Sequence, residues 1–85
     1  MHKKKYNIIP VLEGFEKDPG EELVVSIKIK YIPLEVLQDI FQDNLEGGSL
    51  IIEKKYESIL YEKTGIKINT DKLAFFIGLR SELIK

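Results

Sequence analysis

A chain of this length without a single cysteine has to be held together by one hydrophobic core. Its 85 residues contain no cysteine, which excludes disulfides, cysteine-ligated zinc and thiol nucleophiles. Hydrophobic residues make up 44% and charged residues 32%, a composition typical of a folded globular domain. A domain of this size buries about 60–65% of the surface that its unfolded chain exposes, enough for a modest core. We therefore expect a single domain over residues 6–85.

The N-terminus differs in charge from the rest of the chain. Lys3, Lys4 and Lys5 stand together, and we predict that residues 1–5 form a flexible basic tail. Without these lysines the remaining chain is acidic, which argues against nucleic acid as a partner. No apolar stretch reaches the length of a membrane span or resembles a signal peptide. We expect a cytoplasmic protein without membrane contact.

Two segments near the N-terminus have the pattern of β-strands. Residues 6–15 are rich in β-branched side chains, and Pro10 fits there at an edge or bulge because it has no N–H to donate. Residues 23–30 alternate between apolar and more polar side chains. The turn residues between the segments predict a β-hairpin. The side chains expected to face the core are Leu23, Val25, Ile27 and Ile29, and those expected to face water are Val24, Ser26, Lys28 and Lys30.

Two helices are predicted next. Pro33 suits the first helical position, and the first helix should end near Asp43-Asn44. Ser49 is a good N-cap for a second helix over residues 50–63, and Gly65 is its expected left-handed stop. The apolar faces follow helical spacing: Leu34, Leu37, Ile40 and Phe41 in the first helix, and Ile52, Tyr56, Ile59 and Leu60 in the second.

The C-terminal segment fits two structures. Leu73, Phe75, Ile77 and Leu79 alternate as in a strand. A helix capped by Asp71 is also possible, because helical spacing fits another set of residues: Leu73, Phe76, Ile77, Leu83 and Ile84. We favour a strand over residues 72–80, because a hairpin alone is marginally stable in water. The expected fold class is therefore α+β in the order β-β-α-α-β, with a three-stranded antiparallel sheet and two helices packed on one face.

The sequence contains no recognisable catalytic constellation. Its one histidine is His2, at the terminus. Gly47-Gly48-Ser49 precedes a predicted helix, as a phosphate-binding turn would, but the Lys-Ser/Thr pair of the Walker pattern does not follow. We therefore interpret it as a connector. We predict no catalytic residue, no metal and no cofactor, and a binding module rather than an enzyme.

Carboxylates on the first predicted helix are the strongest candidates for a contact surface. Glu35, Asp39 and Asp43 are spaced i, i+4 and i+8, so they would project from one helix face, with Glu46 beside them. Like charges at this spacing destabilise a helix by about 0.2–0.5 kcal/mol per pair, which suggests that the row serves a basic partner. A row lacks the convergent oxygens that hard cations need. The alternative interpretation is an ordinary solvated helix face.

Two further surfaces deserve consideration. Tyr61 lies off the apolar stripe of the second helix and is a plausible anchor at the rim of an interface. The sheet face turned away from the helices would combine Val24, Lys28 and Lys30 with Ile9 and Val11 or their alternates. This mixed apolar and basic face is either a self-association surface or a partly covered second minicore.

A pattern in the second half of the chain resembles a known group of proteins. Gly65-Ile66, Ile68, Asp71 and Phe75-Phe76 follow a hairpin and two predicted helices. This order resembles small uncharacterised bacterial proteins found near contact-dependent and polymorphic toxin loci, where immunity proteins occur. Leu73 and Ala74 depart from the pattern, which more often has Tyr and Asp there. The resemblance implies a bacterial cytoplasmic protein that binds and neutralises a cognate toxin, and it transfers no functional residue.

Together these observations predict an immunity-type inhibitor that occludes a basic toxin domain sterically and electrostatically. The alternative is a self-associating structural or regulatory domain that uses the open sheet face. We expect a monomer or a weak homodimer. The predicted partner-binding residues are Glu35, Asp39, Asp43, Glu46 and Tyr61.

Overall fold

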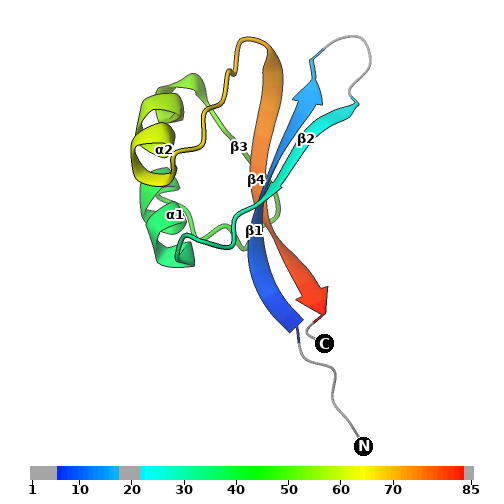
Figure 1. Cartoon of the computed structure of the whole chain (residues 1–85), viewed down its shortest axis with the longest axis vertical. Coiled ribbons are helices and arrows are strands. Elements are labelled where there is room, and N and C mark those ends of the chain that lie inside the picture. The colour runs from blue at the N-terminus through cyan, green and yellow to red at the C-terminus, as the bar shows by residue number, and fades with distance from the viewer. Residues whose placement is uncertain (1–5, 18–21, 84–85) are drawn as a thin grey trace, which may run out of the picture.

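Two long strands form the centre of this molecule. The computed structural model describes residues 6–17 and 22–83, so the predicted tail at residues 1–5 lies outside the described residues. β1 (Tyr6–Glu16) and β4 (Leu73–Leu83) pair in antiparallel fashion along their whole length. β2 (Leu23–Lys28) flanks β1, and the two-residue β3 (Leu50–Ile51) flanks β4, which gives the sheet order β2-β1-β4-β3. α1 (Leu34–Phe41) and α2 (Glu57–Thr64) lie on one side of this sheet (Figure 1).

The core lies between the sheet and the helices. Leu12 is opposite Ile27 on one side and Ile77 on the other, so the three side chains form a row that faces the helices. Removing a side chain of this size from water stabilises the fold by about 1.5–3 kcal/mol. The most completely buried side chains come from the sheet, both helices and two connecting segments: Leu12, Ile29, Leu37, Leu45, Leu60 and Ile77.

Pro10 ends the pairing between β1 and β2. Its carbonyl accepts a hydrogen bond of 2.8 Å from the N–H of Ile29, but it has no N–H to return. The ladder on this side of β1 therefore stops, while the ladder to β4 continues to Tyr6. The prediction that Pro10 sits where a strand loses its neighbour is confirmed.

The prediction of three strands in the order β-β-α-α-β is wrong in one element. Leu50 and Ile51, assigned to the second helix, form β3 against Ile77 and Phe76. The order is β-β-α-β-α-β, and the sheet has four antiparallel strands. α2 begins at Glu57, after a 3₁₀ turn at Lys54–Tyr56, so Ser49 is not an N-cap. The edge of β4 offers backbone hydrogen bonds to this segment, including 2.8 Å from the Ile52 N–H to the Phe75 carbonyl, and these stabilise an extended chain.

A bulge changes the facing of β2. The register shifts between Gly14 and Phe15, so that Leu23 pairs with Phe15 on the face opposite the helices. Leu23 is 51% exposed, and its predicted core position is wrong. Val25 and Ile27 are half-buried and Ile29 is buried, as the alternation predicts.

Other predicted elements are confirmed. The C-terminal segment is a strand rather than a helix, and Gly65 ends α2 with a left-handed φ of 78°. In α1, Leu37, Ile40 and Phe41 are buried as expected, and Leu34 is half-buried. No helix in the described part of the chain is long and apolar enough to cross a membrane.

Candidate protein-binding surface

Two of the predicted contact residues lie on the exposed side of α1. Leu37, Ile40 and Phe41 anchor this helix in the core. Glu35 and Asp39 lie one turn apart and are exposed. The buried face holds the helix in place, so these two carboxylates are presented from a rigid element.

Asp43 does not extend this row along the helix. α1 ends at Phe41, and Gln42 adopts a left-handed conformation with φ of 53°. The helix therefore ends two to three residues before the predicted end at Asp43-Asn44. The Asp43 carboxylate instead accepts a hydrogen bond of 2.6 Å from the N–H of Leu45. This contact turns the chain so that the Leu45 side chain enters the core, at a positive φ of 64° that is unfavourable for leucine.

Glu46 lies three residues after Asp43, on the same loop. Its backbone N–H donates a hydrogen bond of 3.0 Å to the Asn44 side chain, and its carboxylate lies 3.4 Å from the amide nitrogen of the same asparagine. The four carboxylates thus lie on a short helix and on the loop that follows it. We call this set of residues, Glu35, Asp39, Asp43 and Glu46, the acidic surface.

The acidic surface carries uncompensated charge. Within residues 6–17 and 22–83, none of its four carboxylates takes part in an ion pair. Residues 31–53 contain no lysine or arginine at all. By contrast, Glu13, Asp71 and Glu82 are each bound to a basic side chain at 2.8–3.0 Å. Glu16 and Glu62 also form no ion pair within the described residues, so the acidic surface is set apart mainly by lying in a 23-residue segment without a basic side chain.

Tyr61 occupies a different part of the helical layer. Its side chain is 57% exposed on α2. It lines a shallow depression with Glu57, Ser58, Lys67 and Ile68, and no residue of α1 takes part. The structure thus leaves Tyr61 accessible but does not place it within the acidic surface.

Two other tyrosines make contacts within the fold. The Tyr31 hydroxyl donates a hydrogen bond of 3.1 Å to the carbonyl of Thr64, which ties the segment after β2 to the end of α2. The Tyr56 ring packs edge-on against Phe41 with 5.0 Å between ring centroids. Tyr56 is therefore part of the contact between the helices.

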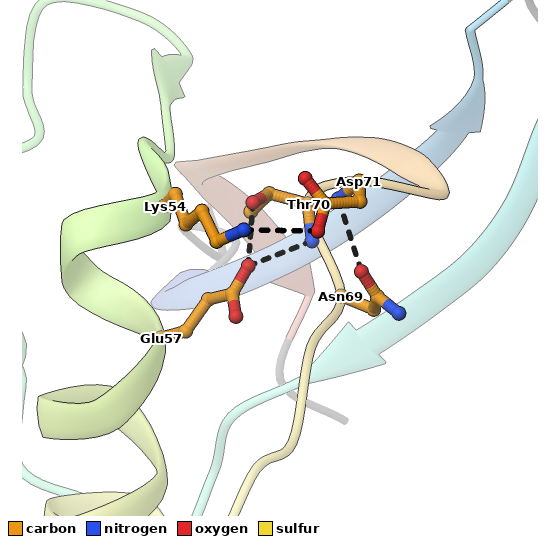
Figure 2. A network of polar contacts seen from close by, with 5 residues as sticks. All are labelled: Lys54, Glu57, Asn69, Thr70 and Asp71. Carbon is orange, nitrogen blue, oxygen red and sulfur yellow. Dashed lines mark hydrogen bonds and ion pairs between the residues drawn. The ribbon is translucent and has the colours of Figure 1, made fainter.

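A polar network joins the start of α2 to the segment before β4 (Figure 2). The Glu57 carboxylate accepts hydrogen bonds from the N–H and the hydroxyl of Thr70, and these lower the pKa of its carboxyl group. The Lys54 ammonium lies 3.0 Å from the Asp71 carboxylate, and this contact raises the pKa of Lys54 and lowers that of Asp71. Every partner in this network is another part of the same chain. Its role is to fasten residues 69–71 to α2.

Ion pairs cover part of the sheet face that points away from the helices. This is the face predicted to be a second minicore or a self-association surface. Ile9 and Val11 are on this face and yet are buried. Lys28 and Lys30 both bind Glu82 from across the sheet, at 2.9 and 3.0 Å. Hydrogen bonds from Lys28 and Lys30 lower the pKa of Glu82, and the bond from Lys28 has the larger effect. We infer that the aliphatic stems of these side chains cover the small apolar cluster.

The remaining part of this face is apolar and hollow. Phe15 and Phe76 pack edge-on, with ring centroids 5.7 Å apart. They line a depression of about 540 Å³ together with Ala74 and the ion pair between Glu13 and Arg80. The sequence pattern marks the segments of Phe15 and Phe76 as strands but does not predict that the two rings share a face. Their common face follows from register, since Phe76 pairs with Glu13 and Ala74 with Phe15.

The sequence raised two kinds of ligand site, a metal site and an anion site at a helix N-terminus. In the described part of the chain, no group of three or more His, Cys, Asp or Glu side chains is arranged to hold a metal ion. Gly47-Gly48-Ser49 precedes the strand β3 rather than a helix, so it does not present a helix N-terminus to an anion. Comparisons with protein families, curated proteins and solved structures find no match for this chain.

Proposed function

We propose that this chain is a small protein-binding domain, an immunity-type inhibitor that neutralises a cognate bacterial toxin by occluding it. The observation that carries the proposal is the uncompensated charge of the acidic surface. Its four carboxylates are exposed and form no ion pair within the described residues, and they belong to a sequence segment, residues 31–53, without lysine or arginine. The resemblance noted in the sequence adds the expectation that the partner is a toxin domain.

The acidic surface suits a basic partner for two physical reasons. Enzymes that act on nucleic acids carry positive charge where they meet phosphates, so a patch of carboxylates is complementary to them and speeds their encounter. α1 is also held in place by its buried face, so little conformational entropy is lost when a partner binds Glu35 and Asp39. The mechanism requires no chemistry, only coverage of the partner's active surface.

Tyr61 has a supporting role in this proposal. α1 and α2 lie on the same side of the sheet (Figure 1). In this proposal the partner covers both helices and so reaches Tyr61 as well as the acidic surface. Exposed tyrosines are common anchors in protein interfaces because they bury a large ring and offer a hydroxyl.

Binding kinetics test the proposal. The triple variant E35Q/D39N/D43N keeps side-chain size and the oxygen that accepts the Leu45 N–H, but it removes three charges. Its association with the partner protein recovered by pull-down with the wild-type chain should be slower at low salt. The difference should shrink at high salt, because screening acts over about 8–10 Å at working ionic strength.

A matched control separates a local from a general charge effect. The variant E16Q/E22Q/E53Q removes three other exposed carboxylates, none of them in the acidic surface. It should associate at nearly the wild-type rate. Equal rates for wild type and the E35Q/D39N/D43N variant at both salt concentrations would contradict the proposal, as would equal slowing by both triple variants.

A further inference from the structure

One edge of the sheet is left without a neighbouring strand. β3 pairs with Ile77 and Phe76 only, and β4 continues to Leu83. The Phe75 carbonyl points toward β3, where it accepts the Ile52 N–H, so every second residue after it directs its N–H and C=O to the same outer side. These residues are Leu79, Ser81 and Leu83. Among the described residues, no strand pairs with this part of the edge.

No proline and no bulge interrupts residues 79–83 on this edge. Exposed edges normally carry prolines, bulges, charged side chains or very short strands that discourage addition of another chain. Of these features, residues 79–83 carry only the charges of Arg80 and Glu82, which have opposite signs. β4 and β1 instead form a regular ladder as far as Leu83 and Tyr6, and this end extends beyond both helices (Figure 1). On its helix-side face, Ile8 and Leu83 are 55% and 47% exposed.

The sequence of this edge is complementary to itself. Residues 79–83 read Leu-Arg-Ser-Glu-Leu. In an antiparallel pair centred on Ser81, each Leu79 would lie opposite Leu83 of the second copy, and each Arg80 opposite Glu82 of the second copy. We propose that two copies of this chain associate through β4, by antiparallel pairing of residues 79–83 about a two-fold axis at Ser81.

Charge selects this register over its neighbours. Shifting the centre to Arg80 would place the two arginines directly opposite each other, and shifting it to Glu82 would do the same for the two glutamates. Like charges opposite each other destabilise a strand pair. A two-fold axis midway between two residues would change the pairing by one residue. That register would turn the side chains of one copy to the wrong face of the sheet. Arg80 and Glu82 already have partners in their own chain, so the new pairs select the register more than they add affinity.

The other face of the ribbon offers a place for the leucines. A groove of about 270 Å³ lies between β4 and the loop after α1. Its lining includes the apolar residues Ile8, Leu45 and Leu79, and also the charged residues Glu46 and Arg80. In the register centred on Ser81, Leu83 of the second copy lies opposite Leu79, beside this groove. Apolar area that is exposed in one copy would therefore be buried in two.

The present edge contains one contact that pairing would replace. The Arg80 Nη1 donates a hydrogen bond of 3.0 Å to the carbonyl of Leu79, one of the outward-directed groups. Turning Arg80 toward Glu82 of the second copy frees this carbonyl for a backbone hydrogen bond. Because the pair is antiparallel, the helices of the two copies lie at opposite ends of the joined sheet. Five paired residues make a small interface, so the dimer belongs to the weak class that forms at high protein concentration.

Cysteine crosslinking tests the register directly, because the chain has no cysteine of its own. In S81C, the two new thiols lie opposite each other with about 5.5 Å between Cα atoms, a separation that a disulfide can span. In the matched control L83C, the two Cα atoms are about 14 Å apart, four residues along the strand, which is too far. Mild oxidation should link S81C into dimers and leave L83C monomeric. Equal linkage of both variants would overturn the proposed register.

The oligomeric state of the cysteine-free chain tests the association itself. Sedimentation from about 10 µM to about 1 mM should show a rising dimer fraction in the wild type. S81P removes an N–H that points outward, not into the ladder with β1, so it should abolish the dimer, whereas S81A keeps the N–H and the dimer. If S81P melts early, L83E offers a second disruption at an exposed site. A wild type that stays monomeric, or a dimer that survives both S81P and L83E, would overturn the proposal.

Discussion

The guanidinium of Arg80 lies 2.8 Å from the carboxylate of Glu13, and it reaches this partner across Gly78. A Cβ atom at Gly78 would lie 3.1 Å from Arg80 Nη1 and 3.2 Å from the hydroxyl of Ser49. The missing side chain thus lets Arg80 lie along β4, where the ion pair borders the depression floored by Phe15 and Phe76. A glycine in the middle of a strand marks a close approach here, as it often does.

Two glycines of the sheet should respond differently to alanine. At Gly14 the new Cβ would lie 2.8 Å from the ring of Phe75, a buried side chain with little room to move. We expect G14A to lower the free energy of unfolding by about 1–3 kcal/mol. G78A should have a smaller effect, because the side chains of Arg80 and Ser49 can shift. Urea denaturation measures both, and G47A is the control, since nothing lies within 4 Å of the added atom. A loss for G78A as large as that for G14A would contradict this reasoning.

Phe41 is the largest buried side chain at the end of α1. It is 3% exposed and packs edge-on against Tyr56. We expect F41A to lower the free energy of unfolding by about 3–5 kcal/mol, a large fraction of the total for a domain of this kind. Y56F keeps both rings and should change the melting temperature little. An unchanged melting temperature for F41A would show that the helix packs differently from the structure described.

Asp43 has a structural contact that can be separated from its charge. Its carboxylate binds the N–H of Leu45, the buried leucine with a left-handed backbone. D43A leaves that N–H without its partner and should lower the free energy of unfolding by about 1 kcal/mol. D43N retains an acceptor oxygen and should be close to wild type. If D43N and D43A unfold at the same urea concentration, the hydrogen bond is not what holds the loop.

Acid should destabilise the protein through its bonded carboxylates. Hydrogen bonds lower the pKa of Glu57, Asp71 and Glu82 in the folded state. The unfolded state then binds more protons, so this contribution is present above the ordinary pKa of 4.5 for Glu57 and is lost as the pH falls through the lowered value. E57Q should show a smaller loss of melting temperature between neutral and acid pH than wild type. T70V should do the same because it removes the donor hydroxyl, while T70S keeps it. Parallel pH profiles for wild type and E57Q would refute this assignment.

The elements with a strong local pattern were predictable. The apolar alternation of residues 73–79, the helical spacing of Leu37, Ile40 and Phe41, and the glycine after α2 are all confirmed. In each case the residue pattern and the final environment agree, because the element is amphipathic and has one face to bury. The carboxylates of the acidic surface could also be named in advance. They alternate along α1 and its loop with the apolar residues that are buried, so they were expected on the outer side.

β3 could not be predicted, because its partner is remote in the sequence. The spacing of Ile52, Tyr56 and Ile59 indicates a helix, and Ile52 is indeed buried. It reaches the core from an extended segment, however, because the edge of β4 supplies the hydrogen bonds that a helix would otherwise make for itself. The apolar spacing of this segment is compatible with both conformations. The choice between them depends on a strand that follows more than 20 residues later.

The sequence by itself determined a cysteine-free α+β domain, the two strands of the N-terminal hairpin, the buried face of α1 and the acidic character of residues 31–53. It favoured a strand over a helix at residues 72–80 without deciding between them. Tertiary structure alone decided the fourth strand, the exposure of Leu23 at a bulge, the turn that takes Asp43 off the helix, and the free edge at residues 79–83. The physical reason is that periodicity records which side chains must be buried. Which backbone groups find a partner depends on segments that only folding brings together.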